Sequence, residues 1–167
     1  MEIKFKRLVD IAIAPTKHYS SDAGFDLYAA EDVEIFAGET KLVTTGLAFE
    51  LPVGYELQVR PRSGVSLDSP LKVILGTVDA GYRGEVGIIV YNSQQVEYAS
   101  MPRLISPILK GDNDFNITKG IVKSISIHKG DKIAQAIIQK LPNIELIESD
   151  ELNAGDRGLN GFGSTGV

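Results

Sequence analysis

Short runs in which hydrophobic and polar residues alternate cover most of the chain, and this two-residue period is typical of half-buried β-strands. At the N-terminus, Ile3 and Phe5 begin such a run, so residues 1–13 are predicted to contain a strand with one buried face. The other predicted strands, which are separated by turn residues, cover 33–36, 40–51, 55–60, 73–78, 85–91, 120–127 and 132–141, with a shorter one inside 22–30.

One segment breaks the strand pattern and predicts a short helix. Pro61 ends the strand before it, and Ser63 stands where a side-chain N-cap would begin a helix over about 64–69. Many short strands, frequent turns and a single helix predict an all-β fold, which would be a sandwich, a jelly roll or a barrel.

The composition indicates one domain and excludes several classes of function. With 167 residues, of which 43% are hydrophobic, the chain is long enough to form one core. The net charge of -5 argues against nucleic-acid binding, and the lack of cysteine removes disulfides, thiolate metal sites and thiol nucleophiles. Because the chain has neither a long apolar run nor a signal region, we expect no membrane association and a location in the cytoplasm of the cell or infected host.

Two segments depart from the strand pattern. Residues 93–119 form a long connection with prolines and apolar residues, and we interpret them as an insertion that either docks a protein partner or is a tolerated surface loop. The tail, 154–167, holds five of the 17 glycines and is predicted to be a mobile lid. The expected organisation is one domain, 1–153, followed by this lid.

Three stretches carry groups that suit phosphate oxygens. Arg62, Ser63 and Gly64 offer a cation, a hydroxyl and backbone N–H groups, although a capped turn with a surface arginine explains the same residues. Gln135 follows a turn and has small neighbours, so its amide is either a phosphate donor or an outward-facing polar group. The tail is either an incidental end or a second cradle with a ring that stacks on a base, formed by Arg157, Phe162, Gly163, Ser164 and Thr165.

A predicted hairpin carries two further candidates. Within GTVDAGYRGEVGIIVYN, residues 76–92, Asp79 is placed to orient and deprotonate a water, and Tyr82 to lie flat beneath a sugar. The alternatives are an Asp that closes its own turn and a Tyr that pairs across strands. Asp26 either holds a hydrated Mg²⁺ through its waters or is a structural carboxylate near a turn.

Taken in order, five stretches resemble the five motifs of the trimeric dUTPases, the deoxyuridine triphosphate nucleotidohydrolases. They are DAGFDLYAA, PRSG, GTVDAGYRGEVGIIVYN, GDKIAQ and RGLNGFGSTG, and together they span Asp22 to Gly166. The resemblance implies a homotrimer of distorted jelly rolls, of the β-clip type, with active sites shared between subunits. It also implies Mg²⁺-dependent hydrolysis of dUTP to dUMP and pyrophosphate, which keeps uracil out of DNA and supplies dUMP for thymidylate synthesis.

The same resemblance implies a role for each candidate residue. Asp79 would activate the water that attacks the α-phosphorus, and Tyr82 would pack under the deoxyribose and exclude a 2′-hydroxyl. Hairpin backbone groups, including those of Gly76, would read the uracil edge, and Asp26 would fix the hydrated Mg²⁺. The residues that would hold the phosphate chain or close over the nucleotide are Arg62, Ser63, Gly64, Gln135, Arg157, Phe162, Gly163, Ser164 and Thr165.

Three features depart from the family pattern. Val73 stands where many members have an Asn, six residues before the catalytic Asp, and Lys132 stands where Arg is commoner in the fourth motif. The segment 93–119 is longer than the usual link and resembles extra segments of phage-encoded members.

Other functions stay open as alternatives. A regulatory protein would use 93–119 or the tail to bind a protein partner, and this role is compatible with dUTP hydrolysis. A dCTP deaminase has the same fold, but the complete tail and the Tyr of YRG favour a dUTPase. A structural jelly-roll trimer has no use for five donor-rich motifs.

Overall fold

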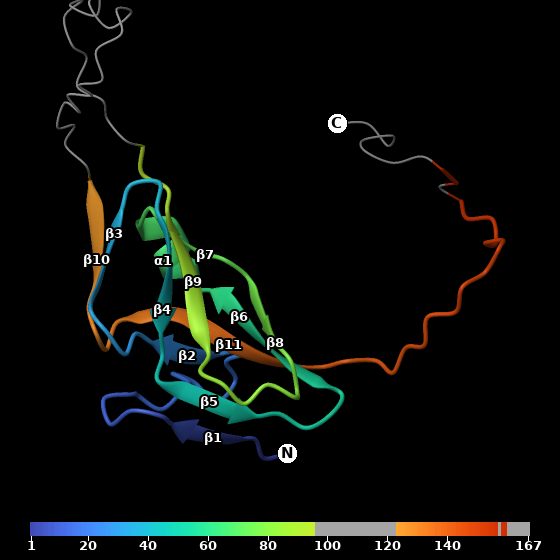
Figure 1. Ribbon diagram of the computed structural model, residues 1–167, viewed down its shortest axis with the longest axis horizontal. Helices are drawn as coiled ribbons and strands as arrows, with labels where there is room; N and C mark the ends of the chain where they lie inside the picture. The colour runs from blue at the N-terminus through green and yellow to red at the C-terminus, as the bar shows by residue number, and fades with distance from the viewer. Residues whose placement is uncertain (96–122, 157, 160–167) are drawn as a thin grey trace, which may run out of the picture.

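The computed structural model describes residues 1–95, 123–156 and 158–159, and short β-strands make up most of its regular structure (Figure 1). Within these residues there are eleven strands and one helix, which confirms the predicted all-β class with a single short helix. Their bounds are β1 Lys4–Arg7, β2 Phe25–Tyr28, β3 Val33–Phe36, β4 Thr40–Thr44, β5 Leu47–Glu50, β6 Tyr55–Pro61, α1 Ser63–Asp68, β7 Leu71–Val73, β8 Gly76–Val78, β9 Gly87–Asn92, β10 Ser124–Ile127 and β11 Lys132–Lys140.

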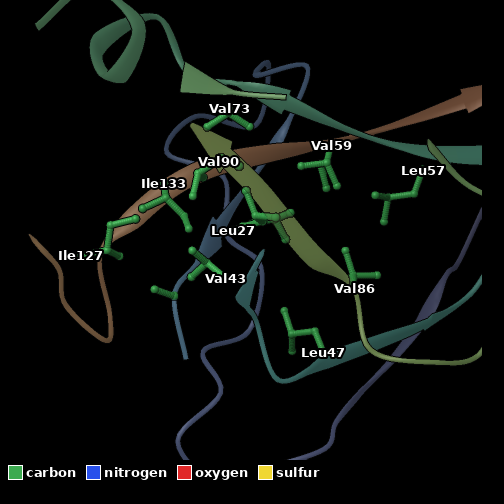
Figure 2. Packing of buried hydrophobic residues seen from close by; sticks show 14 of the residues in the cluster. Leu27, Val43, Leu47, Leu57, Val59, Val73, Val86, Val90, Ile127 and Ile133 are labelled. Atoms are coloured by element: carbon green, nitrogen blue, oxygen red, sulfur yellow. The ribbon is translucent and has the colours of Figure 1, made fainter. Parts of the chain in front are cut away.

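The strands form four small antiparallel sheets that enclose one core, as in a distorted jelly roll. Their orders are β2-β11-β6-β8, β4-β9-β7, β1-β5 and β10-β3. Alternate side chains from these sheets point toward a common interior, where Leu27, Leu57 and Val90 are almost completely buried (Figure 2). The core therefore joins strands that lie far apart in the sequence.

Two segments that the sequence predicts to be single strands are each divided between two sheets. Residues 40–51 bend at Gly46, whose φ of +66° favours glycine, so β4 and β5 pair with different partners. Residues 73–78 divide after Val73, since β7 pairs with β9 whereas β8 pairs with β6. The predicted hairpin of 73–78 with 85–91 is therefore present only at its base, where Val73 pairs with Val90 and the Ile74 N–H donates to the Ile89 carbonyl oxygen at 2.8 Å, whereas the turn at Asp79 joins two sheets.

Two local predictions near the chain start and the helix are also wrong. The four residues of β1 are exposed, because this strand pairs with β5 at the surface and Phe5 packs beside Phe49, at 6.2 Å between ring centroids. The helix is present, but Ser63 is its first helical residue, and the N-cap is Arg62, in extended conformation without a side-chain capping bond. Ser63 is one position too late to be a cap.

After β11 the chain leaves the body of the fold as an extended segment, which we call the C-terminal arm (residues 141–153; Figure 1). Its apolar side chains face solvent in the single chain, and Leu146 is 94% and Ile147 is 80% exposed. No helix in the described part of the chain has the length and apolar character needed to span a membrane.

Candidate active site

The loop between β8 and β9 (residues 79–86, the β8–β9 loop) carries Asp79 and Tyr82 beside a pocket. Asp79 directly follows β8, and the loop returns to the core at Val86, which is 2% exposed. The pocket has a volume of about 280 Å³ and is lined by Leu42, Thr77, Val78, Asp79, Tyr82, Glu85, Val86 and Gly87. Two carboxylates, those of Asp79 and Glu85, and one aromatic ring therefore border an open space whose wall is partly polar and partly apolar.

Tyr82 is held against its own loop. Its hydroxyl donates to the Glu85 carbonyl oxygen at 3.0 Å, and its ring lies over Gly84. A Cβ at position 84 would lie 2.4 Å from the Tyr82 hydroxyl oxygen, so the ring can occupy this place because residue 84 is a glycine. The side chain is still 48% exposed, which leaves part of the tyrosine available to a ligand.

The tip of the loop is stabilised by bonds among its own residues. The Tyr82 N–H donates to the Asp79 carbonyl oxygen at 3.0 Å. The Arg83 guanidinium donates to the carbonyl oxygens of Ala80, at 2.6 Å, and Tyr82, at 2.9 Å. Arg83 therefore stabilises the turn and orders the backbone between the carboxylate and the aromatic ring.

A second group of candidates gathers around Asp26, at the end of the large sheet where β2, β11 and β6 meet. Asp26 Oδ1 lies 3.0 Å from Arg62 Nε, and Asp26 Oδ2 lies 2.9 Å from Lys132 Nζ. Arg62 also donates to the Lys132 carbonyl oxygen at 2.9 Å. The Asp26 carboxylate raises the pKa of the Lys132 ammonium by hydrogen bonding and by its charge. Two cations are thus held close together by one carboxylate.

Gln135 belongs to the same group. It is the register partner of Asp26 between β11 and β2, and its amide donates to the Pro61 carbonyl oxygen at 2.9 Å. A Cβ at Gly24 would lie 2.6 Å from Gln135 Oε1, so the glycine makes room for this side chain. Ser63 comes directly after Arg62 in the chain, is the first residue of α1, and is exposed.

The structure therefore brings Asp26, Arg62, Ser63, Gly64 and Gln135 together, as expected of a phosphate site, but it places Asp79 elsewhere. In the ladder between β6 and β8, Val78 is opposite Leu57, so Asp79 lies at the level of Glu56 near the start of β6, whereas Arg62 follows its end. Five or six residue steps of about 3.3 Å separate the two groups by roughly 17–20 Å. This is much longer than a triphosphate, so the two groups of one chain do not meet on one nucleotide.

Gly76 lies between the two groups, in β8. It is the register partner of Val59 in β6, and a Cβ at Gly76 would lie at an ordinary contact distance of 3.5 Å from Val59 Cβ. The tail candidates Arg157, Phe162, Gly163, Ser164 and Thr165 lie outside the described residues, as do residues 96–119 of the predicted insertion.

The donor set around Asp26 suits a magnesium ion that keeps its water. The described residues contain no group of three or more side chains of the kind that encloses a metal ion. Mg²⁺ is commonly held by one or two carboxylates together with water and substrate phosphates, and Asp26 supplies one carboxylate that is 16% exposed. In the structure, each carboxylate oxygen of Asp26 has a cationic side chain as its partner. A hydrated metal would take the place of one of these two partners.

Several residues of the site were not found from the sequence. In the sequence, Lys132 stands out only as a departure from the fourth motif, whereas the structure pairs it with Asp26. Glu85 accepts the hydrogen bond of the Tyr82 hydroxyl, and Gly84 lies under the Tyr82 ring. In the sequence, only their place within YRGE links these two residues to Tyr82. Thr45 lies far from every motif in the sequence, and nothing in its neighbourhood indicated its bond to Val86.

Comparison with known proteins gives a consistent result. The family model described as dUTPase matches residues 10–104 and 101–166. A deoxyuridine 5′-triphosphate nucleotidohydrolase of Gloeothece citriformis is 41% identical, over 100% of this chain and 98% of the relative. The dUTPase of Staphylococcus bacteriophage 80alpha, solved with dUpNHpp, has a TM-score of 0.82 at 27% identity, with 99% of each chain covered. A dUTPase from phage phi11 of S. aureus, described with a coordinated structural Mg(II) ion, has a TM-score of 0.73 at 29% identity and covers 90% of this chain and 98% of its own.

Proposed function

Because this chain belongs to the dUTPase family, we propose that it hydrolyses dUTP to dUMP and pyrophosphate by attack of water on the α-phosphorus. The observation that carries the proposal is the division of the site into two groups with complementary chemistry. The pocket beside Asp79 and Tyr82 suits a nucleoside, and the cluster around Asp26 suits a polyphosphate. The dUTPase of Staphylococcus bacteriophage 80alpha was solved with dUpNHpp, a compound of the same substrate class.

In the nucleoside half, the Asp79 carboxylate accepts the proton of the attacking water. A carboxylate in this role must lie within hydrogen-bond reach of the water, and its exposed position after β8 allows that. Tyr82 packs beneath the deoxyribose, where a 2′-hydroxyl would be crowded. The backbone of the loop and of Gly76 reads the uracil edge.

In the phosphate half, the side chains that now neutralise Asp26 bind the phosphate oxygens. Arg62 and Lys132 supply positive charge, while Gln135, Ser63 and the Gly64 backbone supply further donors. Phosphoryl transfer depends mainly on positioning and charge neutralisation, so this set of groups needs no covalent nucleophile. Bound Mg²⁺ would neutralise phosphate charge, and Asp26 would hold it through its waters.

The separation of the two groups favours a shared site in a homotrimer. A chain that carries the nucleoside half at one end of β6 and the phosphate half at the other completes neither site alone. The outward face of the β4-β9-β7 sheet exposes Leu42 and its register partner Ile89, which a contact between copies would bury. The C-terminal arm leaves the body of the fold after β11, and in the proposed trimer it would carry the tail residues Arg157, Phe162, Gly163, Ser164 and Thr165 to the site of another copy.

The test is a pyrophosphate-release assay with dUTP, UTP, dTTP and dCTP, each with and without Mg²⁺. We expect hydrolysis of dUTP that requires Mg²⁺, with little release from the other three nucleotides. Ammonia release from dCTP would instead identify a deaminase, which the names of the relatives do not favour. We expect this activity in the cytoplasm.

A further inference from the structure

The β8–β9 loop is joined to the body of the fold through residues 45–47, at the bend between β4 and β5. Thr45 Oγ1 donates to the Val86 carbonyl oxygen at 2.6 Å, and the Val86 N–H donates to the Leu47 carbonyl oxygen at 2.8 Å. The Gly46 N–H donates to Glu85 Oε1 at 2.7 Å. Three hydrogen bonds thus hold the last two residues of the loop.

The bend itself is a fixed support. Thr45 is 1% exposed, and its hydroxyl also accepts a hydrogen bond from the Leu47 N–H at 3.2 Å, so it is satisfied on both sides. At Gly46, a Cβ would lie 2.7 Å from Ala12 Cβ and 2.7 Å from Val9 Cγ2, so the backbone there is tightly enclosed. A buried, hydrogen-bonded bend has little freedom to move, and it transmits its position to the loop.

Tyr82 takes its position from the residue that this bend holds. Its hydroxyl donates to the backbone oxygen of Glu85, whose side chain is bound to Gly46. We infer that Thr45 and Glu85 are positioning residues that set the fit of Tyr82 beneath the sugar, and therefore the preference for deoxyribose over ribose. The inference rests on the proposed function, because it takes Tyr82 as the residue that faces the sugar.

The first test compares two substitutions at one buried position. Thr45→Val keeps the shape of the side chain but cannot donate to the Val86 carbonyl oxygen, whereas Thr45→Ser keeps the hydroxyl. We expect Thr45→Val to lower the ratio of kcat/KM for dUTP to that for UTP by about tenfold, because small misplacements of substrate-positioning groups have large kinetic effects. Thr45→Ser should restore the ratio to within about twofold of the wild type.

A second pair at Glu85 decides the question if Thr45→Val fails to fold. Glu85→Ala removes the acceptor for the Gly46 N–H and should lower the same ratio, whereas Glu85→Gln keeps a carbonyl oxygen and should not. As a control for general destabilisation, Ile35→Val reduces packing in the core away from the loop, and it should lower Tm without changing the ratio.

The outcomes separate this inference from the proposed function. If the wild type releases pyrophosphate from dUTP and the folded Thr45→Val and Glu85→Ala variants keep wild-type selectivity, the positioning role is wrong. An equal loss of selectivity in Ile35→Val would also overturn it. If the wild type does not hydrolyse dUTP, the proposed function itself fails.

Discussion

At the scale of single residues, the polar side chains of the site are kept in place by one another before any substrate is bound. Asp26 forms ion pairs with both Arg62 and Lys132, and its negative charge offsets the repulsion between these two cations. The sequence could indicate which residues have suitable chemistry, because motifs show residue types and spacing. It could not show that Lys132 pairs with Asp26, since that contact depends on the register between β2 and β11.

The role of Asp79 gives the most direct prediction at this scale. Asp79→Asn keeps the size of the side chain but removes the base, so kcat should fall by about 10²–10⁴-fold while the Kd for dUTP changes little. The measurement is pyrophosphate release under saturating dUTP, together with calorimetric binding of dUTP or a non-hydrolysable analogue. A variant that retains catalysis would remove Asp79 from the mechanism.

At the scale of secondary-structure elements, the sequence predicted most strands but not where the chain changes sheets. The apolar pattern continues through Thr45 and Gly46, so β4 and β5 looked like one strand; the bend requires a positive φ that the pattern does not show. In the same way β7 and β8 looked like one arm of a hairpin, although they pair with β9 and β6. Alternation reports which face a residue occupies, and it does not report which strand lies beside it.

Glu31 attaches the end of β4 and gives a pH-dependent prediction. Glu31 Oε1 accepts hydrogen bonds from the Thr44 hydroxyl at 2.6 Å and the Thr44 N–H at 2.9 Å, and these bonds hold the pKa of Glu31 below its usual 4.5. A carboxyl with a lowered pKa stabilises the folded state above pH 4.5 and loses this contribution as the pH falls through the folded pKa.

Glu31→Gln keeps an acceptor for Thr44 but has no group that titrates in this range. On acidification below pH 4.5, the Tm of the wild type should therefore fall further than that of Glu31→Gln, by on the order of 2 °C, as expected of a partly exposed group. Thermal unfolding followed by circular dichroism across this range measures the difference. Parallel curves for the two proteins would contradict the role of these hydrogen bonds.

At the scale of the whole molecule, the described part of the chain contains the two proposed half-sites and an exposed arm. The sequence motifs could predict the contents of both half-sites, but their separation along β6 appears only in the structure. Among the described residues, the buried core draws on positions from Ala12 to Ala136, and none of its residues comes from the arm. Activity and stability should therefore respond differently to changes at the C-terminus.

A chain that ends at Asp156 tests this difference for the tail. The core of the described residues is built from positions 12–136, so we expect Tm to stay close to that of the full chain. If these residues close over the bound nucleotide, kcat/KM for dUTP should fall by about 100-fold or more, as when groups that position a substrate are lost. Wild-type turnover by the truncated chain would show that the tail is not a lid.

The arm gives the sharpest prediction about assembly. Leu146 and Ile147 are almost completely exposed in the single chain, so replacing both by Asp should cost the isolated chain almost no stability. If the arm packs on another copy, the same two charges would be buried there without partners, and the trimer should dissociate. Because the half-sites lie at opposite ends of β6, the dissociated chains should also lose dUTP hydrolysis.

Light scattering coupled to size-exclusion chromatography measures the mass of the assembly, and the pyrophosphate assay measures the activity on the same fractions. Val53→Asp is the matched control, because Val53 is equally exposed in the turn before β6 but lies outside the arm. The control should remain trimeric and active. If the double variant also stays trimeric and active, the arm does not join the copies, and another surface must bring the two half-sites together.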